Sequence, residues 1–215
     1  AGKLRCHPHW DRLKDLTHFC VVDTNKDDLA KNRNVKADAR FLISAFDRRA
    51  YIRRKRGDLE LDEDPNVTQW VHPDYDFRDT QGAGAGQIRV ESRLGLYYNL
   101  EDDRAGIRRK LTQMLDQATR RENPWRDNEH RVVNVCLYAS VAGGTGSGGF
   151  LPFAYLVKDL VRDHGWGRPN LVSTLSMPST FLDRVERLLH DDIQANGYAP
   201  LKELEHLTKL GYGDH

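Results

Sequence analysis

A glycine-rich stretch, AGGTGSGG over residues 142–149, restricts the fold of this chain more than any other feature. An apolar run over 132–141 precedes it, and apolar residues at helical spacing follow it from Phe150. A strand, a glycine-rich elbow and a helix in this order form an anion site, because glycines let the backbone approach a phosphate and the first N–H groups of the helix point at it. The hydroxyls of Thr145 and Ser147 can add two side-chain donors. The pattern predicts that the chain holds a nucleotide by its phosphates.

The length and composition indicate a globular chain large enough for one sizeable α/β domain, with 39% hydrophobic and 30% charged residues among 215. The 33 basic and 32 acidic residues nearly cancel to a formal charge of +1, which argues against a general nucleic-acid binder. The apolar runs are far shorter than the roughly 20 residues that span a bilayer. Three scattered cysteines, Cys6, Cys20 and Cys136, are typical of reduced thiols. We expect a cytoplasmic protein without a nucleic-acid partner or a membrane span.

Strand-like and helix-like segments alternate along the chain, which predicts an α/β domain with a mostly parallel sheet over residues 17–215. Strands are expected at 17–22, at 132–141 as a fully buried central strand, and at 170–177. Helices are expected over 37–56, 90–99 and 101–119, from Phe150 with Pro152 in the first turn, and from Ala199 after a break at 196–198. Residues 1–16 form a separate polar segment. Its sequence CHPH over 6–9 is interpreted as exposed chain and not as a metal site, because a second Cys/His group does not lie nearby.

Two further loops are suited to a nucleotide. Asp23 and Thr24 follow the first strand, where open α/β sheets bind ligands, although a turn or a helix cap explains these residue types equally well. The loop 82–86 reads GAGAG and has almost no side-chain bulk, so its backbone can lie against a ligand; the alternative is a flexible linker. Arg89 adds a charge that can pair with phosphate. In a parallel sheet these loops and the elbow lie along one edge.

The sequence of the elbow distinguishes among nucleotide-binding folds. It is not a P-loop, because Phe150 follows the last glycine where that motif needs lysine. Gly144, Gly146 and Gly149 match G-x-G-x-x-G, but the next strand ends at Met177 and Pro178 and not at the acidic residue that holds the ribose in dinucleotide-binding folds. An NAD-dependent oxidoreductase is therefore a less favoured alternative.

The string GGTGSG at 143–148 resembles the signature loop of the tubulin/FtsZ superfamily of GTP-binding polymerising proteins, where this loop wraps the nucleotide phosphates. The loop 82–86 is similar to the superfamily's third nucleotide loop, which approaches the γ-phosphate. Asp23 and Thr24 stand where the second loop carries acidic and hydroxyl residues. The segments GAGAGQIR and NGYAPLKELEHL look most like the prokaryotic tubulin-like proteins outside the main division family.

The resemblance implies a three-layer Rossmann-like GTPase domain that binds GTP or GDP with Mg²⁺ and self-associates into filaments. The phosphate-binding residues that it implies are Gly82, Ala83, Gly84, Ala85, Gly86, Gly143, Gly144, Thr145, Gly146, Ser147 and Gly148, with Asp23, Thr24 and Arg89 as further contacts to phosphate or magnesium. Asp183 and Glu186 are similar to the acids that hold the ribose. Asn196 matches the asparagine that reads the guanine edge, and Tyr198 is placed to stack on the base.

Two parts of the superfamily pattern have no counterpart in the sequence. The first glycine-rich loop, expected before the strand at Phe19, does not match residues 1–16. The core helix should continue past residue 215 to an acidic loop that activates water on the neighbouring subunit's nucleotide, so the domain is expected to be truncated in this helix. We assign no catalytic residue within the chain, and GTP hydrolysis would require completion in trans. A non-catalytic tubulin-like filament or scaffold protein is the alternative.

Overall fold

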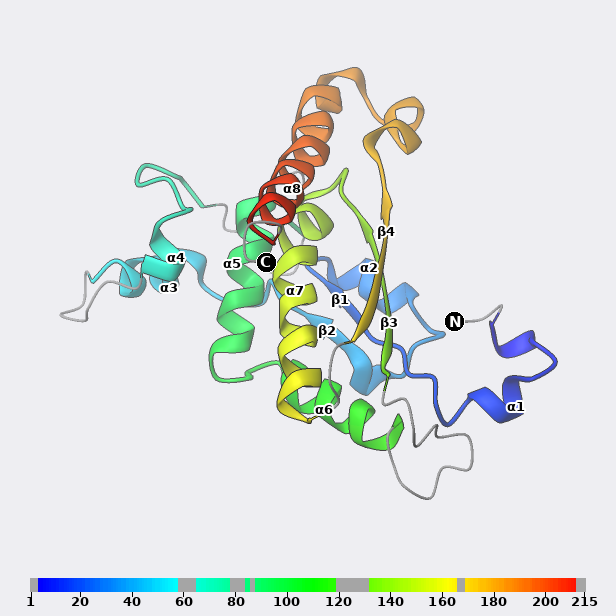
Figure 1. The fold of residues 1–215 in the computed structure, drawn as a ribbon. Helices are drawn as coiled ribbons and strands as arrows, with labels where there is room; N and C mark the ends of the chain where they lie inside the picture. Colours follow the sequence, from blue (N-terminus) through cyan, green and yellow to red (C-terminus); the bar gives the residue numbers. More distant parts are fainter. Residues whose placement is uncertain are drawn as a thin grey trace.

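The computed structural model describes residues 4–57, 65–77, 84–85, 88–118, 132–165 and 169–211. Its strands are β1 (Val21–Asp23), β2 (Arg40–Leu42), β3 (Asn134–Ser140) and β4 (Asn170–Ser176). Its α-helices are α1 (Trp10–Leu13), α2 (Lys26–Lys31), α3 (Arg48–Lys55), α4 (Pro65–Thr68), α5 (Arg89–Glu101), α6 (Ile107–Ala118), α7 (Gly144–Asp163) and α8 (His190–Gly211). Short 3-10 turns lie at Leu4–Cys6, Ala37–Ala39, Pro178–Thr180, Leu182–Arg184 and Arg187–Leu189. Figure 1 shows α5 and α7 side by side, with β3 and β4 alongside α7.

The strands form two parallel pairs. Val21 of β1 lies opposite Arg40 of β2, and Asn134 of β3 lies opposite Asn170 of β4. Each pair is connected through a helix, α2 in the first and α7 in the second, because parallel strands need a crossover connection. The predicted α/β fold with parallel strands is confirmed, and in the described residues the strands belong to two separate two-stranded sheets.

The expected helix over 37–56 is wrong in its first part. Residues Arg40–Leu42 form β2 and pair with β1. The helix α3 begins later, where the carboxylate of Asp47 accepts a hydrogen bond from Ala50 N at 2.9 Å and caps the first turn. Apolar spacing alone does not separate a three-residue strand and a loop from a helix, because the pairing that fixes the strand is a long-range contact.

The strand β3 lies where the sequence predicts a strand, but the expectation of a fully buried central strand is wrong. Exposed and partly buried residues alternate along β3, and the side chains of Tyr138 in β3 and Val172 in β4 are 78% and 52% exposed. Val135 and Ala139, on the other face of β3, pack against apolar clusters that include α7. Within the described structure, α7 covers only one face of this pair of strands, so one set of side chains is buried.

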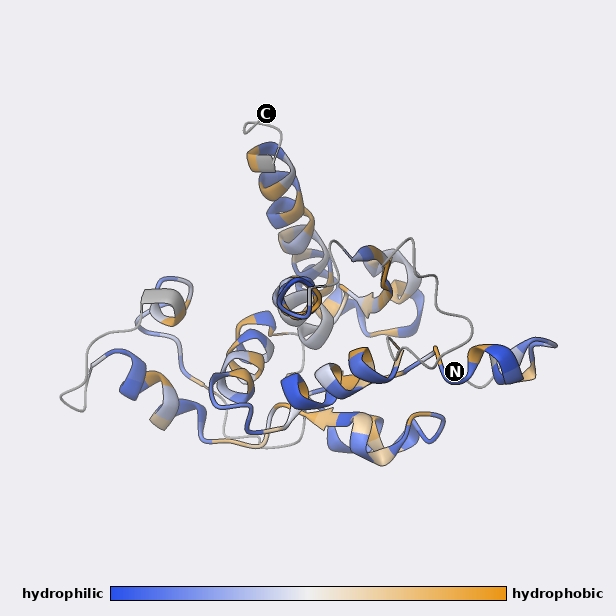
Figure 2. Ribbon diagram, turned by 60° about the horizontal axis from the view of Figure 1, so that its bottom comes forward, coloured by the Kyte–Doolittle hydropathy of each residue, from blue (hydrophilic) through white to orange (hydrophobic). Residues whose placement is uncertain are grey.

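Three apolar clusters hold the elements together. One joins β2, α5, α6 and α7, and contains the fully buried Leu96, Ile107 and Val161. An aromatic cluster joins α3 and α4 to α5, with the Phe46 ring stacked on Tyr98 at 4.2 Å between centroids. The third packs α8 against the end of β3 and the start of α7. Figure 2 shows apolar and polar residues alternating along α8, whose far end projects from the rest of the structure.

The glycines of the elbow are required by packing inside the protein. For three of them a backbone carbonyl oxygen lies where a Cβ atom would stand: Ile88 O for Gly144, Ser140 O for Gly146 and Arg89 O for Gly148. The first turns of α7 therefore lie directly on the end of β3 and the start of α5. From the sequence, we expect these glycines to let a phosphate approach the backbone. In the structure, they let the backbone of neighbouring elements approach.

The helix α7 contains Pro152 in its interior, so the expectation that this proline lies in the first turn is wrong. The helix starts earlier than expected, at Gly144 within the glycine-rich stretch. Proline has no N–H to donate to the carbonyl four residues earlier, which is Gly148 O. Arg93 of α5 donates instead, from Nε to Gly148 O at 3.3 Å, so this carbonyl keeps a hydrogen-bond partner.

The helix α8 runs continuously through 196–198, so the expected break there and the expected start at Ala199 are wrong. Its internal Pro200 leaves the carbonyl of Asn196 without a helical donor. Ser147 of the elbow supplies that donor, because its Oγ donates to Asn196 O at 2.7 Å. A side chain from the neighbouring helix therefore replaces the missing N–H in α8 as it does in α7.

Close packing explains the glycine inside α8. A Cβ atom on Gly197 would overlap the ring of Pro178, in the turn that follows β4. Glycine lowers helix propensity by about 1 kcal/mol relative to alanine, and in a sequence it therefore resembles a helix break. Here it lets α8 lie directly on the turn after β4.

Alanine substitutions at two glycines of α7, Gly146 and Gly149, are expected to change the free energy of unfolding in opposite directions. A Cβ atom on Gly146 overlaps the backbone at the end of β3, so Gly146→Ala is expected to lower the free energy of unfolding by about 2–3 kcal/mol. A Cβ atom on Gly149 meets only Ser92 Oγ at 3.5 Å, an ordinary contact, so Gly149→Ala is expected to gain about 0.5–1 kcal/mol. Urea unfolding followed by circular dichroism measures both values, and equal effects would contradict the packing interpretation.

Candidate functional site

The hydroxyl of Thr24 joins three segments that are far apart in the sequence. Thr24 directly follows β1 and is 1% exposed. Its Oγ1 accepts a hydrogen bond from Ala85 N at 2.8 Å and lies 2.5 Å from Oγ1 of Thr145, in the first turn of α7. The end of β1, the glycine–alanine loop and the glycine-rich elbow therefore meet at one side chain, as expected for loops at one edge of an α/β fold.

The backbone of Thr24 holds the same loops in place. Its carbonyl oxygen accepts from Ser44 Oγ at 2.5 Å and from Gly84 N at 3.0 Å. Gly84 has a φ of +95°, a conformation that favours glycine. Sequence reasoning did not identify Ser44, because its partner Thr24 lies 20 residues earlier, after another strand. The other predicted members of this loop, Gly82, Ala83 and Gly86, lie outside the described residues.

The first turn of α7 is an open helix N-terminus. Its N-cap residue, Gly143, has extended backbone angles and supplies no side-chain cap to the first N–H groups. A Cβ atom on Gly143 would meet nothing described within 4 Å, in contrast to the packed glycines that follow it. The helix is 20 residues long, and its dipole places partial positive charge at this end. Backbone donors, positive potential and open space are together suited to an anion.

Ser147 and Asn196 connect the elbow to α8, and both are buried, at 1% and 4% exposure. Because Ser147 donates its hydroxyl proton to Asn196 O, this hydroxyl is directed at α8 and not at a ligand. The side-chain amide of Asn196 donates to Ala142 O at 3.4 Å, which is a long hydrogen bond. The structure thus brings Asn196 to the elbow, whereas the ring of Tyr198 is 63% exposed.

The guanidinium of Arg89 is paired with an acid of α8. Its Nη2 lies 2.9 Å from Glu203 Oε2 and also donates to Ser147 O at 3.4 Å. Arg93, one turn along α5, contacts both carboxylate oxygens of Glu203, at 2.9 and 2.8 Å. The charge predicted for a phosphate is therefore shared with Glu203 in this structure. Sequence reasoning missed Arg93 and Glu203, because nothing in the local pattern links residues 110 positions apart.

A model of the family described as tubulin-like matches residues 6–215. The chain belongs to the tubulin-like family. No curated protein and no solved structure matches this tubulin-like chain. Among its described helices, none is long and apolar enough to cross a membrane.

The predicted acidic residues of the tubulin-like chain occupy different places. Asp23 ends β1, and its Oδ1 accepts from Asn25 N at 3.0 Å, so the turn interpretation describes this residue as well. Asp183 and Glu186 are exposed in the turns that follow β4. Over the described ranges, no three His, Cys, Asp or Glu side chains gather as a metal site. A single carboxylate next to an anion site nevertheless fits Mg²⁺, which proteins hold through one or two carboxylates together with substrate phosphates.

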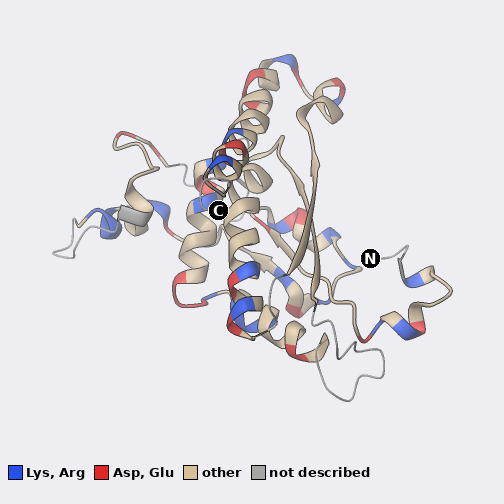
Figure 3. Cartoon of the chain, in the orientation of Figure 1, with Lys and Arg blue, Asp and Glu red and all other residues tan. Residues whose placement is uncertain are grey.

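Several basic residues of α3 form ion pairs with acids of neighbouring segments. Arg49 pairs with Asp76 at 2.8 Å, and Arg54 and Lys55 both pair with Glu101 of α5. Figure 3 shows acidic and basic residues interspersed along the cartoon. Arg54 and Lys55 at the end of α3 therefore join α3 to α5.

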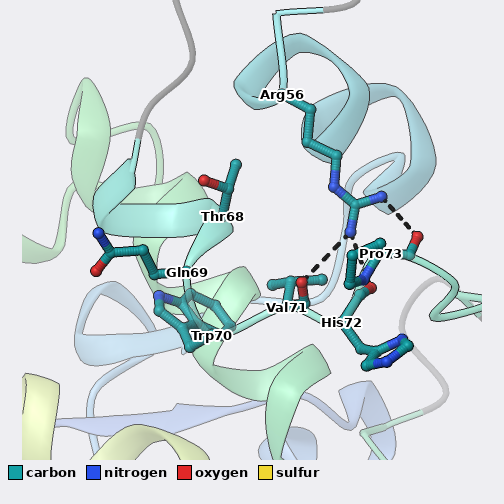
Figure 4. Close-up of a pocket in the computed structure, with 7 residues that line it drawn as sticks. All are labelled: Arg56, Thr68, Gln69, Trp70, Val71, His72 and Pro73. Atoms are coloured by element: carbon teal, nitrogen blue, oxygen red, sulfur yellow. Dashed lines mark hydrogen bonds between the residues drawn. The ribbon is translucent and has the colours of Figure 1, made fainter.

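A pocket lined by Arg56 and residues 68–73 lies beside α3 and α4 (Figure 4). The Arg56 guanidinium donates to Pro73 O and His72 O, each at 2.9 Å, and to Val71 O at 3.5 Å. These bonds join the end of α3 to the chain after α4. Because the charged group of the pocket is occupied by backbone carbonyls, the elbow region is the better candidate for ligand binding.

The carboxylate of Glu203 offers a test of how α8 is held. Glu203→Gln removes the charge shared by Arg89 and Arg93, and is expected to lower the free energy of unfolding by about 1 kcal/mol, because the three side chains are partly exposed. The loss should shrink in 1 M salt. Glu205→Gln is the matched control on the same helix, since Glu205 pairs only on the surface with Lys202 and Lys209. Equal losses in the two variants, measured by urea unfolding, would contradict a special role for Glu203.

Proposed function

We propose that this chain is the nucleotide-binding domain of a tubulin-like GTPase, with a three-layer Rossmann-like architecture and with GTP or GDP as its ligand. The observation that carries the proposal is the meeting of three predicted nucleotide loops at the hydroxyl of Thr24, beside the open N-terminus of α7. The family match supports it. On the segments GAGAGQIR and NGYAPLKELEHL, we assign the chain to the prokaryotic tubulin-like proteins and to the cytoplasm.

The first turn of α7 binds the phosphates in this proposal. The N–H groups of Gly144, Thr145 and Gly146 stand at positions where an α-helix lacks internal acceptors, and they face the same end as the helix dipole. Gly143 leaves room for the anion. Thr145 is partly exposed and adds a side-chain hydroxyl. The close packing of Gly144, Gly146 and Gly148 places the first turn of α7 where its N–H groups can reach the phosphates. Ser147 instead donates its hydroxyl to α8.

The loop before α5 covers the terminal phosphate, and Gly84 and Ala85 fix its position against β1. Asp23 has one carboxylate oxygen engaged in its turn and another available for Mg²⁺. Asp23 would hold Mg²⁺ together with the nucleotide, and the ion would supply charge neutralisation at the phosphates. Arg89 Nη2 donates to Ser147 O of the elbow and is paired with Glu203, which places its charge beside the phosphate position.

The sugar and the base lie toward α8 in this proposal. Asp183 and Glu186 are exposed acids that hold the ribose hydroxyls. The side-chain amide of Asn196, which donates to Ala142 O at 3.4 Å beside the elbow, reads the guanine edge. The exposed ring of Tyr198 stacks on the base.

Hydrolysis requires a second subunit in this proposal. Phosphoryl transfer to water depends mainly on positioning and on stabilising charge, which the elbow and Mg²⁺ supply. We assign the group that activates water to a neighbouring copy, so filament assembly and GTP hydrolysis are linked.

A single substitution at the N-cap separates ligand binding from folding. Gly143→Asp is expected to raise the free energy of unfolding by about 0.5 kcal/mol, because aspartate caps α7 and no described atom obstructs its Cβ. The same variant should weaken GTP binding at least about 100-fold, because its carboxylate occupies the phosphate position. Titration with fluorescent GTP and thermal unfolding measure the two effects. Gly143→Asn, of equal shape without charge, is the control and should weaken binding less.

Titration of the wild-type chain with GTP and with ATP tests the proposal directly. Saturable binding of GTP in preference to ATP supports it, and either no saturable binding by the folded chain or a preference for ATP contradicts it. Light scattering then measures filament assembly, and phosphate release measures GTP hydrolysis. Assembly that is independent of nucleotide and releases no phosphate would identify a non-catalytic scaffold in place of a GTPase.

A further inference from the structure

The two hydroxyls at the centre of the candidate site form a hydrogen bond whose direction matters. Oγ1 of Thr24 and Oγ1 of Thr145 are 2.5 Å apart, and geometry alone allows either to be the donor. Each hydroxyl has one proton to donate and two lone pairs to accept. The direction therefore decides which of the two threonines retains a proton for a ligand.

The surroundings of Thr24 determine this direction. Its Oγ1 already accepts from Ala85 N at 2.8 Å, and Thr24 is 1% exposed, so water does not satisfy its proton. Among the described residues, the acceptor that stands within hydrogen-bond distance of this hydroxyl is Oγ1 of Thr145. Buried donors in proteins are nearly always satisfied, because an unsatisfied one costs about 1–3 kcal/mol. Thr24 is accordingly the donor and Thr145 the acceptor.

We infer that Ala85 N–H, the Thr24 hydroxyl and the Thr145 hydroxyl form a one-way hydrogen-bond chain that directs the Thr145 proton to a phosphate oxygen at the N-terminus of α7. Thr145 is partly exposed, its carbonyl accepts from Ser92 Oγ at 2.9 Å, and its side chain is held by the contact with Thr24 Oγ1, so the residue is fixed in the open first turn. An accepted hydrogen bond makes a hydroxyl a better donor, so each link strengthens the next.

Thr24 is a positioning residue in this arrangement and does not touch the ligand. It couples the glycine–alanine loop to the phosphate through Thr145, so the position of that loop alters the strength of the Thr145 donor. The inference rests on the proposed nucleotide function and specifies how one of its donors is oriented. It replaces the sequence-based role of Thr24 as a direct contact to phosphate or magnesium.

A double-mutant cycle with fluorescent GTP tests the chain. Thr145→Val removes the terminal donor and is expected to weaken GTP binding about tenfold. Thr24→Val keeps the shape of the side chain but removes the hydroxyl that donates to Thr145, and is expected to weaken GTP binding about threefold. In the Thr145→Val background the same Thr24→Val change should weaken binding less than it does in the wild type, because the donor that it orients is gone and only its contact to the loop at Ala85 is lost. Independent, multiplying effects of the two substitutions would overturn the inference.

Two further variants separate this role from folding. Thr24→Ser retains the hydroxyl and should restore binding to within about twofold of the wild type. Ser44→Ala removes a comparable buried hydroxyl. This hydroxyl donates to Thr24 O at 2.5 Å and does not take part in the series of hydrogen bonds from Ala85 N–H to Thr145. The substitution should lower thermal stability and weaken GTP binding by less than Thr24→Val does, because it loosens the loops at Thr24 O but leaves the Thr145 donor oriented. If Ser44→Ala weakens binding as much as Thr24→Val, the role of Thr24 is structural and the inference fails.

These experiments distinguish failure of this inference from failure of the proposed nucleotide-binding function. If the wild-type chain binds no GTP, the proposed function fails and so does this inference. If the wild type binds GTP but the two threonines act independently, the function stands and the direction of the chain is wrong.

Discussion

Direct contact between backbones at the first turns of α7 determines where every other part of the candidate site lies. Gly144 and Gly148 lie against carbonyl groups of Ile88 and Arg89, so α5 and α7 approach more closely than side chains would allow. This closeness lets Ser92 and Arg93 reach the carbonyls of the elbow. A methyl group at either glycine would separate the two helices, and with them the loop before α5 from the elbow.

Side chains that cross between helices satisfy the polar groups that this packing buries. Each of the two internal prolines removes an N–H from its helix, and an unpaired buried carbonyl costs about 1–3 kcal/mol. Arg93 supplies the donor for α7 and Ser147 the donor for α8. Glu203 adds an ionic contact from α8 back to α5. The three helices are thus linked by specific polar contacts near the elbow, in addition to apolar packing.

The sequence predicts the parts of the fold that depend on local order. The apolar run, the glycine elbow and the following helix are consecutive, so β3 is found at its expected place and α7 follows it, although α7 begins earlier than expected, at Gly144. The parallel pairing follows from the crossover helices. Parts that depend on distant partners are not predictable in this way. β2 exists because β1 lies beside it, and Glu203 is identified only once α8 lies on α5. Prolines and glycines mark helix ends in a sequence, but Pro200 and Gly197 lie inside α8, where neighbouring groups compensate for them.

The different surroundings of the elbow glycines bear on how the motif would change during evolution. Selection for a folded domain is enough to retain Gly144, Gly146 and Gly148, because their neighbours are protein backbone whether or not a nucleotide is bound. Gly143, whose Cβ atom would meet no described atom within 4 Å, is not constrained in this way by the described residues. A descendant that lost nucleotide binding would therefore keep most of the GGTGSG string and diverge first at its leading glycine. Across homologues, the residue at position 143 is accordingly a better marker of nucleotide binding than the motif as a whole.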